Sequence, residues 1–161
     1  AIVSGVGPPG TMPRGMAPLA RLGFLLAPRW PAAVQAVVHP LARLAVTRPQ
    51  RYLARVAAQM APADRPILAR PAVQAMFARD YAAAFAQGVA PFVEDLGLIA
   101  APWGFAAAAP AAPLALWHGD ADRMVPPSAS RELALRTGAV LRECPGEGHF
   151  MVFDRWTEVL D

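Results

Sequence analysis

The amino-acid sequence predicts an α/β fold, and three features near its C-terminal end carry this prediction. Residues 114–117 form a short apolar run between a proline and a Gly-Asp loop, which is typical of a buried strand. Residues 139–144 have the pattern of a second, half-buried strand. Between them, Pro126 and Pro127 are a helix start signal and Gly138 is a helix stop signal. The two strands should be parallel, because a parallel pair needs a crossover connection of this kind, and such crossovers are almost always right-handed.

Residues 1–11 are expected to add one strand and a loop to the same sheet. Ile2 and Val3 are apolar, and Ser4 follows them at the end of the expected strand. The sequence begins with Ala1 and runs directly into this apolar stretch. We therefore expect the chain to be a C-terminal fragment, with earlier strands of the sheet lying upstream of Ala1.

Residues 12–101 carry no strong strand pattern and predict an all-helical region. The expected helices span residues 18–27, 31–39, 50–60, 71–79, 81–87 and 92–99. Prolines fall at or near their borders, as a fixed φ angle and a missing N–H group require. These prolines are Pro28, Pro31, Pro40, Pro49, Pro62, Pro66 and Pro71. The helices are amphipathic, with apolar residues such as Tyr52, Val56 and Met60 at helical spacing.

An acid and a histidine follow the two C-terminal strands. Because the carboxyl ends of parallel strands share one edge of a sheet, the loops that hold Asp122 and His149 should open on the same side. Neighbouring strands lie about 4.8 Å apart, so the carboxylate can reach the imidazole. Such a carboxylate would fix the ring tautomer through Nδ1 and stabilise the imidazolium that forms when the other nitrogen takes a proton.

Other polar residues near these loops are given structural roles. Asp120 is expected to bond loop backbone, as Asx residues commonly do. His118, at the end of a strand, is interpreted as a satisfied structural histidine, and Glu147 as a solvated loop residue. His39 is expected at a helix end on the surface.

These loops resemble the second half of the α/β-hydrolase fold, of the capped type. Members of that superfamily carry the acid in a Gly-x-x-Asp-x-x-Val-Pro loop and the histidine in a Gly-His loop. The matching residues here are Gly119, Asp122, Val125, Pro126, Gly148 and His149. The likeness covers roughly residues 100–161, including a linker at 102–105 and a final helix over residues 153–160. It implies that residues 1–11 and 102–161 belong to the hydrolase core, and that residues 12–101 form a helical cap over the active site.

The nucleophile of that family is missing from this chain. The family places its serine in a Gly-x-Ser-x-Gly elbow, ahead of the acid. Ser4 has Ile2 and Val6 at the glycine positions, and Ser128 and Ser130 are expected to be helix-capping hydroxyls. Cys144 is interpreted as a buried structural thiol. The nucleophile, a serine or an aspartate, and the oxyanion-hole amides are therefore expected upstream of Ala1.

The resemblance implies esterase- or lipase-like hydrolysis of a small, mostly apolar ester, with His149 as general base and then general acid, and Asp122 orienting it. Dehalogenase, epoxide hydrolase, aminopeptidase and carbon–carbon hydrolase chemistry share the scaffold and remain alternatives. A different class of hypothesis is a non-catalytic fragment or interaction module, inactive without its N-terminal half. The 161-residue chain alone is predicted to be inactive. Its uncovered sheet edge predicts self-association.

Composition excludes several other classes. All 15 basic residues are arginines that are spread along the chain against 12 acids, so nucleic-acid binding has little support. One cysteine excludes an internal disulfide, and no cysteine–histidine spacing suggests a metal site. No cofactor is implied. The longest apolar stretch, residues 104–117, is interrupted by Pro110 and Pro113 and is shorter than the roughly 20 residues a membrane helix needs. A cytoplasmic protein that acts on a small molecule is the default expectation.

Overall fold

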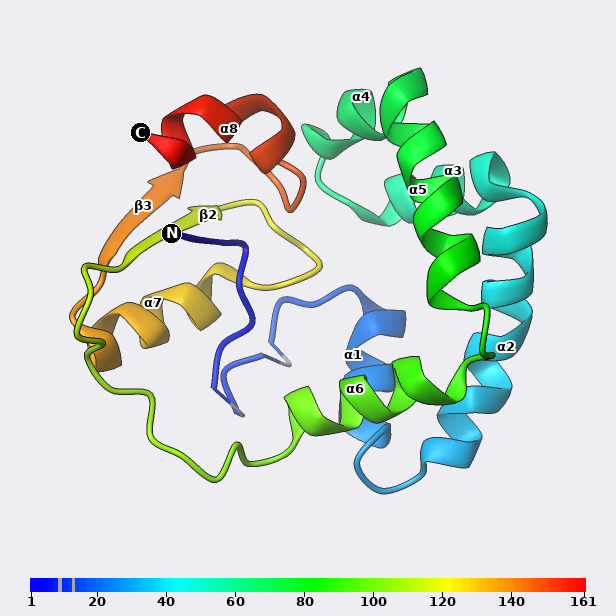
Figure 1. The fold of residues 1–161 in the computed structure, drawn as a ribbon, viewed down its shortest axis with the longest axis horizontal. Helices are drawn as coiled ribbons and strands as arrows, with labels where there is room; N and C mark the ends of the chain where they lie inside the picture. The colour runs from blue at the N-terminus through cyan, green and yellow to red at the C-terminus, as the bar shows by residue number, and fades with distance from the viewer. Residues whose placement is uncertain (9, 13) are drawn as a thin grey trace.

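The two C-terminal strands pair in parallel, as predicted. The computed structural model describes residues 1–8, 10–12 and 14–161. In it β2 (Ala115–Gly119) lies beside β3 (Val140–Cys144), with Leu116 opposite Leu141. The short strand β1 (Ile2–Val3) pairs in parallel with the other edge of β2 (Figure 1). The sheet order is therefore β1-β2-β3, and the central strand is the most buried of the three.

One helix covers each face of this small sheet. Helix α7 (Pro127–Thr137) is the crossover between β2 and β3, and it ends at Gly138, whose φ of 68° is the left-handed conformation that favours glycine. Helix α8 (Val152–Leu160) lies on the opposite side of the strands (Figure 1). Its Val159 packs on a buried cluster that contains Trp117 of β2. We call this sheet with α7, α8 and their loops the α/β unit.

Six helices between β1 and β2 form a separate layer, which we call the helical unit. They are α1 (Pro18–Leu26), α2 (Pro31–Thr47), α3 (Pro49–Gln59), α4 (Asp64–Leu68), α5 (Pro71–Ala84) and α6 (Ala90–Ala100). In Figure 1, α2 to α5 stand beside the α/β unit, and α1 and α6 lie next to each other. All six fall within residues 12–101, the predicted helical region.

The helical unit contacts the α/β unit through two hydrophobic clusters. The first joins Met12 and Phe24 to Val125 and Ala129 of the α/β unit. In the second, four buried side chains of the helical unit are packed against aromatic rings that follow β3. These four are Leu53, Met60, Leu68 and Val73, and the rings are those of Phe150 and Phe153. The segment that carries the predicted catalytic histidine thus packs directly on α3 to α5.

Three predicted helices, over residues 31–39, 71–79 and 81–87, had the wrong bounds, and one helix was not predicted. Helix α2 does not stop at Pro40 but continues to Thr47, because Ala42 and Ala45 beyond the proline are buried and favour continuing the helix. The two helices expected over residues 71–79 and 81–87 are the single helix α5, since Asp80 between them is not a helix breaker. Helix α4 was not predicted, because its five residues are too few to show a period.

Two further features bear on the expected partners. No helix in the described part of the chain is long and apolar enough to cross a membrane. The outer edge of β1 has no strand beside it among the residues that the structure describes, and Ile2 on that strand is 37% exposed. Whether this edge drives self-association stays a prediction.

Candidate active site

The predicted acid and histidine lie in direct contact. Asp122 is in the loop after β2 and His149 in the loop after β3. Because these strands are parallel neighbours, both loops emerge at the same edge of the sheet. Nδ1 of His149 is 2.8 Å from Oδ2 of Asp122, a hydrogen-bond distance. The structure therefore brings together both residues that the sequence singled out.

The Asp122 carboxylate is held in one orientation by its own loop. Its Oδ1 atom accepts the backbone N–H groups of Met124 at 2.8 Å and Val125 at 2.9 Å. These local bonds are the Asx-type turn that an aspartate favours in a loop. They leave Oδ2 directed at the imidazole of His149, and the whole side chain is inaccessible to solvent.

The hydrogen bonds to Asp122 determine its charge state. Burial by itself would raise the pKa of this carboxyl group. Hydrogen bonds from His118 and His149, the charge of His149 and the N–H group of Val125 act in the opposite direction and lower the pKa to about 2. Asp122 is therefore ionised at neutral pH, as a residue that orients and stabilises an imidazolium must be.

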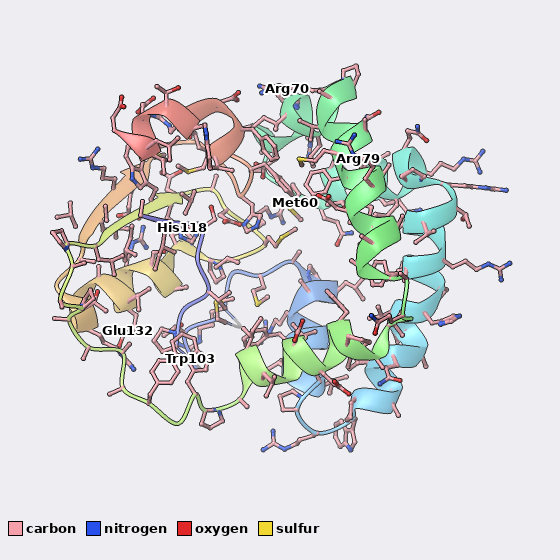
Figure 2. The ribbon with its side chains drawn as sticks, in the orientation of Figure 1. Met60, Arg70, Arg79, Trp103, His118 and Glu132 are labelled. Atoms are coloured by element: carbon pink, nitrogen blue, oxygen red, sulfur yellow. The ribbon has the colours of Figure 1, made fainter. Side chains whose placement is uncertain are left out.

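His118 is a satisfied structural histidine, as predicted, but it also touches the acid. It lies on β2, where Figure 2 labels it within the α/β unit, and it is completely buried. Its Nε2 atom is 2.9 Å from the carbonyl oxygen of Val125 and 3.3 Å from Oδ2 of Asp122. Both partners are acceptors, so we assign the proton to Nε2. The Nδ1 atom then accepts the hydroxyl of Ser130 at 2.6 Å.

Close backbone approach joins the acid loop to the histidine loop. A Cβ atom at Gly119 would overlap the carbonyl group of Glu147, so only glycine fits there. The N–H group of Ala121 donates to that same carbonyl at 3.0 Å. Asp120 bonds loop backbone as predicted, because its Oδ1 atom accepts the N–H group of Gly146 at 2.7 Å. The two loops thus form one hydrogen-bonded unit.

The second ring nitrogen of His149 faces away from the acid. The side chain is 21% exposed, and its ring meets that of Phe150 edge to face with centroids 5.2 Å apart. Within the described residues, no side chain or backbone group is hydrogen-bonded to Nε2 of His149. Nε2 can therefore form a hydrogen bond with a further group, such as a substrate or a nucleophile.

The hydroxyl and thiol groups of the chain are used elsewhere. Ser4, which has a positive φ of 48°, donates its hydroxyl to the carbonyl oxygen of His149 at 3.2 Å rather than to the ring. Ser128 donates to the carbonyl oxygen of Thr11 at 3.3 Å, and Ser130 bonds His118. The prediction that Ser128 and Ser130 cap α7 was wrong, because the cap position belongs to Pro126 and the two serines lie inside the helix. Cys144 is buried as predicted, and burial raises the pKa of its thiol.

Two other sequence-based interpretations need correction. Glu147 is not simply solvated, because its carboxylate is paired with the guanidinium of Arg155 on α8 at 2.6 Å. His39 is exposed as predicted, but it lies in the middle of α2 rather than at a helix end, because that helix continues past Pro40.

Sequence reasoning missed Asp64, the first residue of α4. Its side chain is completely buried, and its two carboxylate oxygens accept the backbone N–H groups of His149 at 3.2 Å and Phe150 at 2.9 Å. No local pattern signals this role, because the donors lie 85 and 86 residues further along the chain.

The described part of the chain holds no cluster of metal ligands at the site. Among the residues described, no three His, Cys, Asp or Glu side chains are grouped as metal ligands would be. A hollow beside α1 is lined by residues such as Phe24, Pro28 and Ala101 and does not include Asp122 or His149.

Two comparisons with known proteins found no match for this chain. No protein-family model matches it, and no curated protein is significantly similar to it in sequence.

Proposed function

We propose that Asp122 and His149 are the acid and the base of a hydrolase of the capped α/β-hydrolase type. It would act on a small, mostly apolar ester, and its nucleophilic serine would come from polypeptide outside these 161 residues. One observation carries the proposal. A fully buried, ionised carboxylate bonds Nδ1 of His149 at 2.8 Å, while Nε2 has no hydrogen-bond partner within the described residues.

This geometry suits general acid–base catalysis. With its proton fixed on Nδ1 by Asp122, neutral His149 offers the lone pair of Nε2 to a serine hydroxyl. The serine oxygen then bonds the ester carbon, and the proton passes from Nε2 to the departing alcohol as the ester C–O bond breaks. A water molecule repeats the sequence on the acyl-enzyme, with His149 again taking and returning one proton.

The surroundings of His149 support an apolar substrate. Phe150, the residue after His149, packs on an apolar cluster of the helical unit that includes Leu53, Met60 and Phe77. Figure 2 shows Met60 where the helical unit meets the α/β unit. A helical layer beside the histidine loop supports the proposal that residues 12–101 act as a cap. Which nucleophile is present would decide between ester, halide and epoxide substrates.

A non-catalytic interaction module is the second candidate. It is favoured by the outer edge of β1, which has no neighbouring strand among the described residues. A chain with such an edge can pair with another strand through backbone groups.

Esterase assays separate the two candidates. We expect the 161-residue chain to hydrolyse short p-nitrophenyl esters no faster than its His149→Ala variant. Joined to any polypeptide that its gene encodes before Ala1, it should gain activity that falls by several orders of magnitude in His149→Ala. His39→Ala, which removes an exposed histidine on α2, is the matched control and should keep full activity. A folded longer protein without activity would favour the interaction module, and His149-dependent turnover by the chain alone would show that the nucleophile lies within it.

A further inference from the structure

Three distant parts of the chain converge on the histidine loop. Asp122 bonds the ring of His149, Ser4 bonds its carbonyl oxygen at 3.2 Å, and Asp64 bonds its N–H group at 3.2 Å. Of these three residues, only Asp64 belongs to the helical unit, where it is the first residue of α4.

We infer that Asp64 is a positioning residue through which the helical unit holds the catalytic base in place. The catalytic part of this inference rests on the proposed function. The structural part, a carboxylate of the helical unit that fixes the backbone of the histidine loop, stands independently of it.

Both oxygens of the Asp64 carboxylate bond this loop. Oδ2 accepts the N–H group of His149 and Oδ1 that of Phe150 at 2.9 Å, so successive amides of the loop point at one carboxylate. The side chain has no exposure to solvent. Hydrogen bonds to an ionised acceptor are about twice as strong as those between neutral groups, so they can orient a turn that has no regular secondary structure.

Gly148 is explained by the same contact. A Cβ atom at this position would overlap the carboxylate of Asp64. Its φ angle is not in the left-handed region, so conformational freedom does not require a glycine there. The glycine before His149 therefore leaves room for a side chain from the helical unit, a reason that the local sequence does not reveal.

Aromatic packing supports the same attachment. Phe77 of α5 meets Phe150 edge to face, with ring centroids 5.7 Å apart. Phe150 therefore receives a polar contact from α4 and an apolar contact from α5. A shift of these helices away from the α/β unit would break both contacts and leave only Asp122 and Ser4 bonded to His149.

Amide hydrogen exchange measured by NMR tests the structural part on the 161-residue chain. In Asp64→Asn, one of the two acceptor oxygens becomes an NH₂ group, which cannot accept an N–H. We expect the amides of His149 and Phe150 to exchange about tenfold faster or more, while those of β2 and β3 keep their protection. The proton shared by His149 Nδ1 and Asp122 should give a downfield signal that broadens in the variant.

Asp154→Asn is the matched control. It removes an exposed ion pair with Arg70, which also joins the helical unit to the α/β unit but does not touch the histidine loop. We expect its His149 and Phe150 amides to exchange as in the wild type. Equal acceleration in both variants, or none in Asp64→Asn, would overturn the inference.

A measurement on the unchanged chain covers the case in which Asp64→Asn does not fold. Scalar couplings across the hydrogen bonds should connect the amide nitrogens of His149 and Phe150 to the carboxyl carbon of Asp64. Their absence, with other couplings of this kind observed, would overturn the assignment.

Kinetics of the longer, active protein test the catalytic part. In Asp64→Asn we expect kcat for a p-nitrophenyl ester to fall about tenfold with little change in KM, because the base is misplaced while the substrate pocket is kept. An unchanged kcat would overturn the positioning role and leave the proposed hydrolase intact. Absence of activity in every variant would count against the hydrolase, while the exchange and coupling results would still decide the Asp64 contact.

Discussion

The α/β unit and the helical unit are held together by different kinds of contact. In the α/β unit, five consecutive residue pairs join β2 to β3, and backbone bonds link the acid loop to the histidine loop. In the helical unit, separate clusters of apolar side chains hold the helices together.

This difference explains where the reactive groups lie. Hydrogen bonds between paired strands restrict both the distance and the direction between the groups they join. Apolar contacts are non-directional, so helices held by them can shift relative to one another. Asp122 and His149 follow the hydrogen-bonded strands β2 and β3, and the apolar cluster of the helical unit packs against the histidine loop. Through Asp64, the helical unit makes a polar contact of its own with the histidine loop.

The largest effect on stability is expected from a substitution in the apolar cluster between α3, α4 and α5. Leu53 is 2% exposed there, so Leu53→Ala should lower the free energy of unfolding by about 2–5 kcal/mol, as measured by urea denaturation. Hydrogen exchange should rise first in the helical unit, with β2 and β3 affected less. Leu135→Ala, on the 82%-exposed Leu135 of α7, should change stability by less than about 0.5 kcal/mol. Equal loss of protection in both units would show that they unfold as one.

Acid should act mainly on the α/β unit. The pKa of Asp122 falls from 3.8 in the unfolded chain to about 2 in the folded one, so the unfolded chain binds more protons between these values. The ionised Asp122 carboxylate therefore contributes about 2 kcal/mol above pH 4, and this contribution is lost as the pH falls toward 2. Urea midpoints measured from pH 6 to pH 2 should show this loss, and Asp122→Asn should reduce it.

The exposed pair Asp154–Arg70 provides the control for this pH dependence. Asp154→Asn should leave most of the acid-induced loss in place, because exposed ion pairs contribute little. If the stability difference between the wild type and Asp122→Asn stayed constant over the whole range, the buried pair would not be its source.

The smallest effects are expected at two glycines, one in each unit. Gly138 at the end of α7 has a φ of 68° and Gly88 after α5 has a φ of 88°, and a Cβ atom at either position would meet no other atom within 4 Å. Alanine should therefore cost about 1 kcal/mol of backbone strain at each site. Asparagine, which tolerates this conformation better, should cost less. A smaller cost at Gly88 than at Gly138 would show that the helical unit relaxes around the strain.

The sequence was most informative where the structure depends on near neighbours. Pro127 and Gly138 set the ends of α7, and apolar runs with a crossover between them were enough to predict parallel strands. From that pairing followed the contact between Asp122 and His149. Local signals failed where packing outweighed them, as at Pro40, which α2 includes because the helix beyond it buries Ala42 and Ala45.

By itself, then, the sequence determined the α/β class, the parallel pairing and the two residues that meet at the sheet edge, because spacing, proline and glycine act within a few residues. Only the tertiary structure decided that Ser130 bonds His118 instead of capping α7, and that Asp64 reaches the amides of His149 and Phe150. The reason is physical. A buried polar group must find a hydrogen-bond partner, and that partner can lie anywhere along the chain that folding brings near.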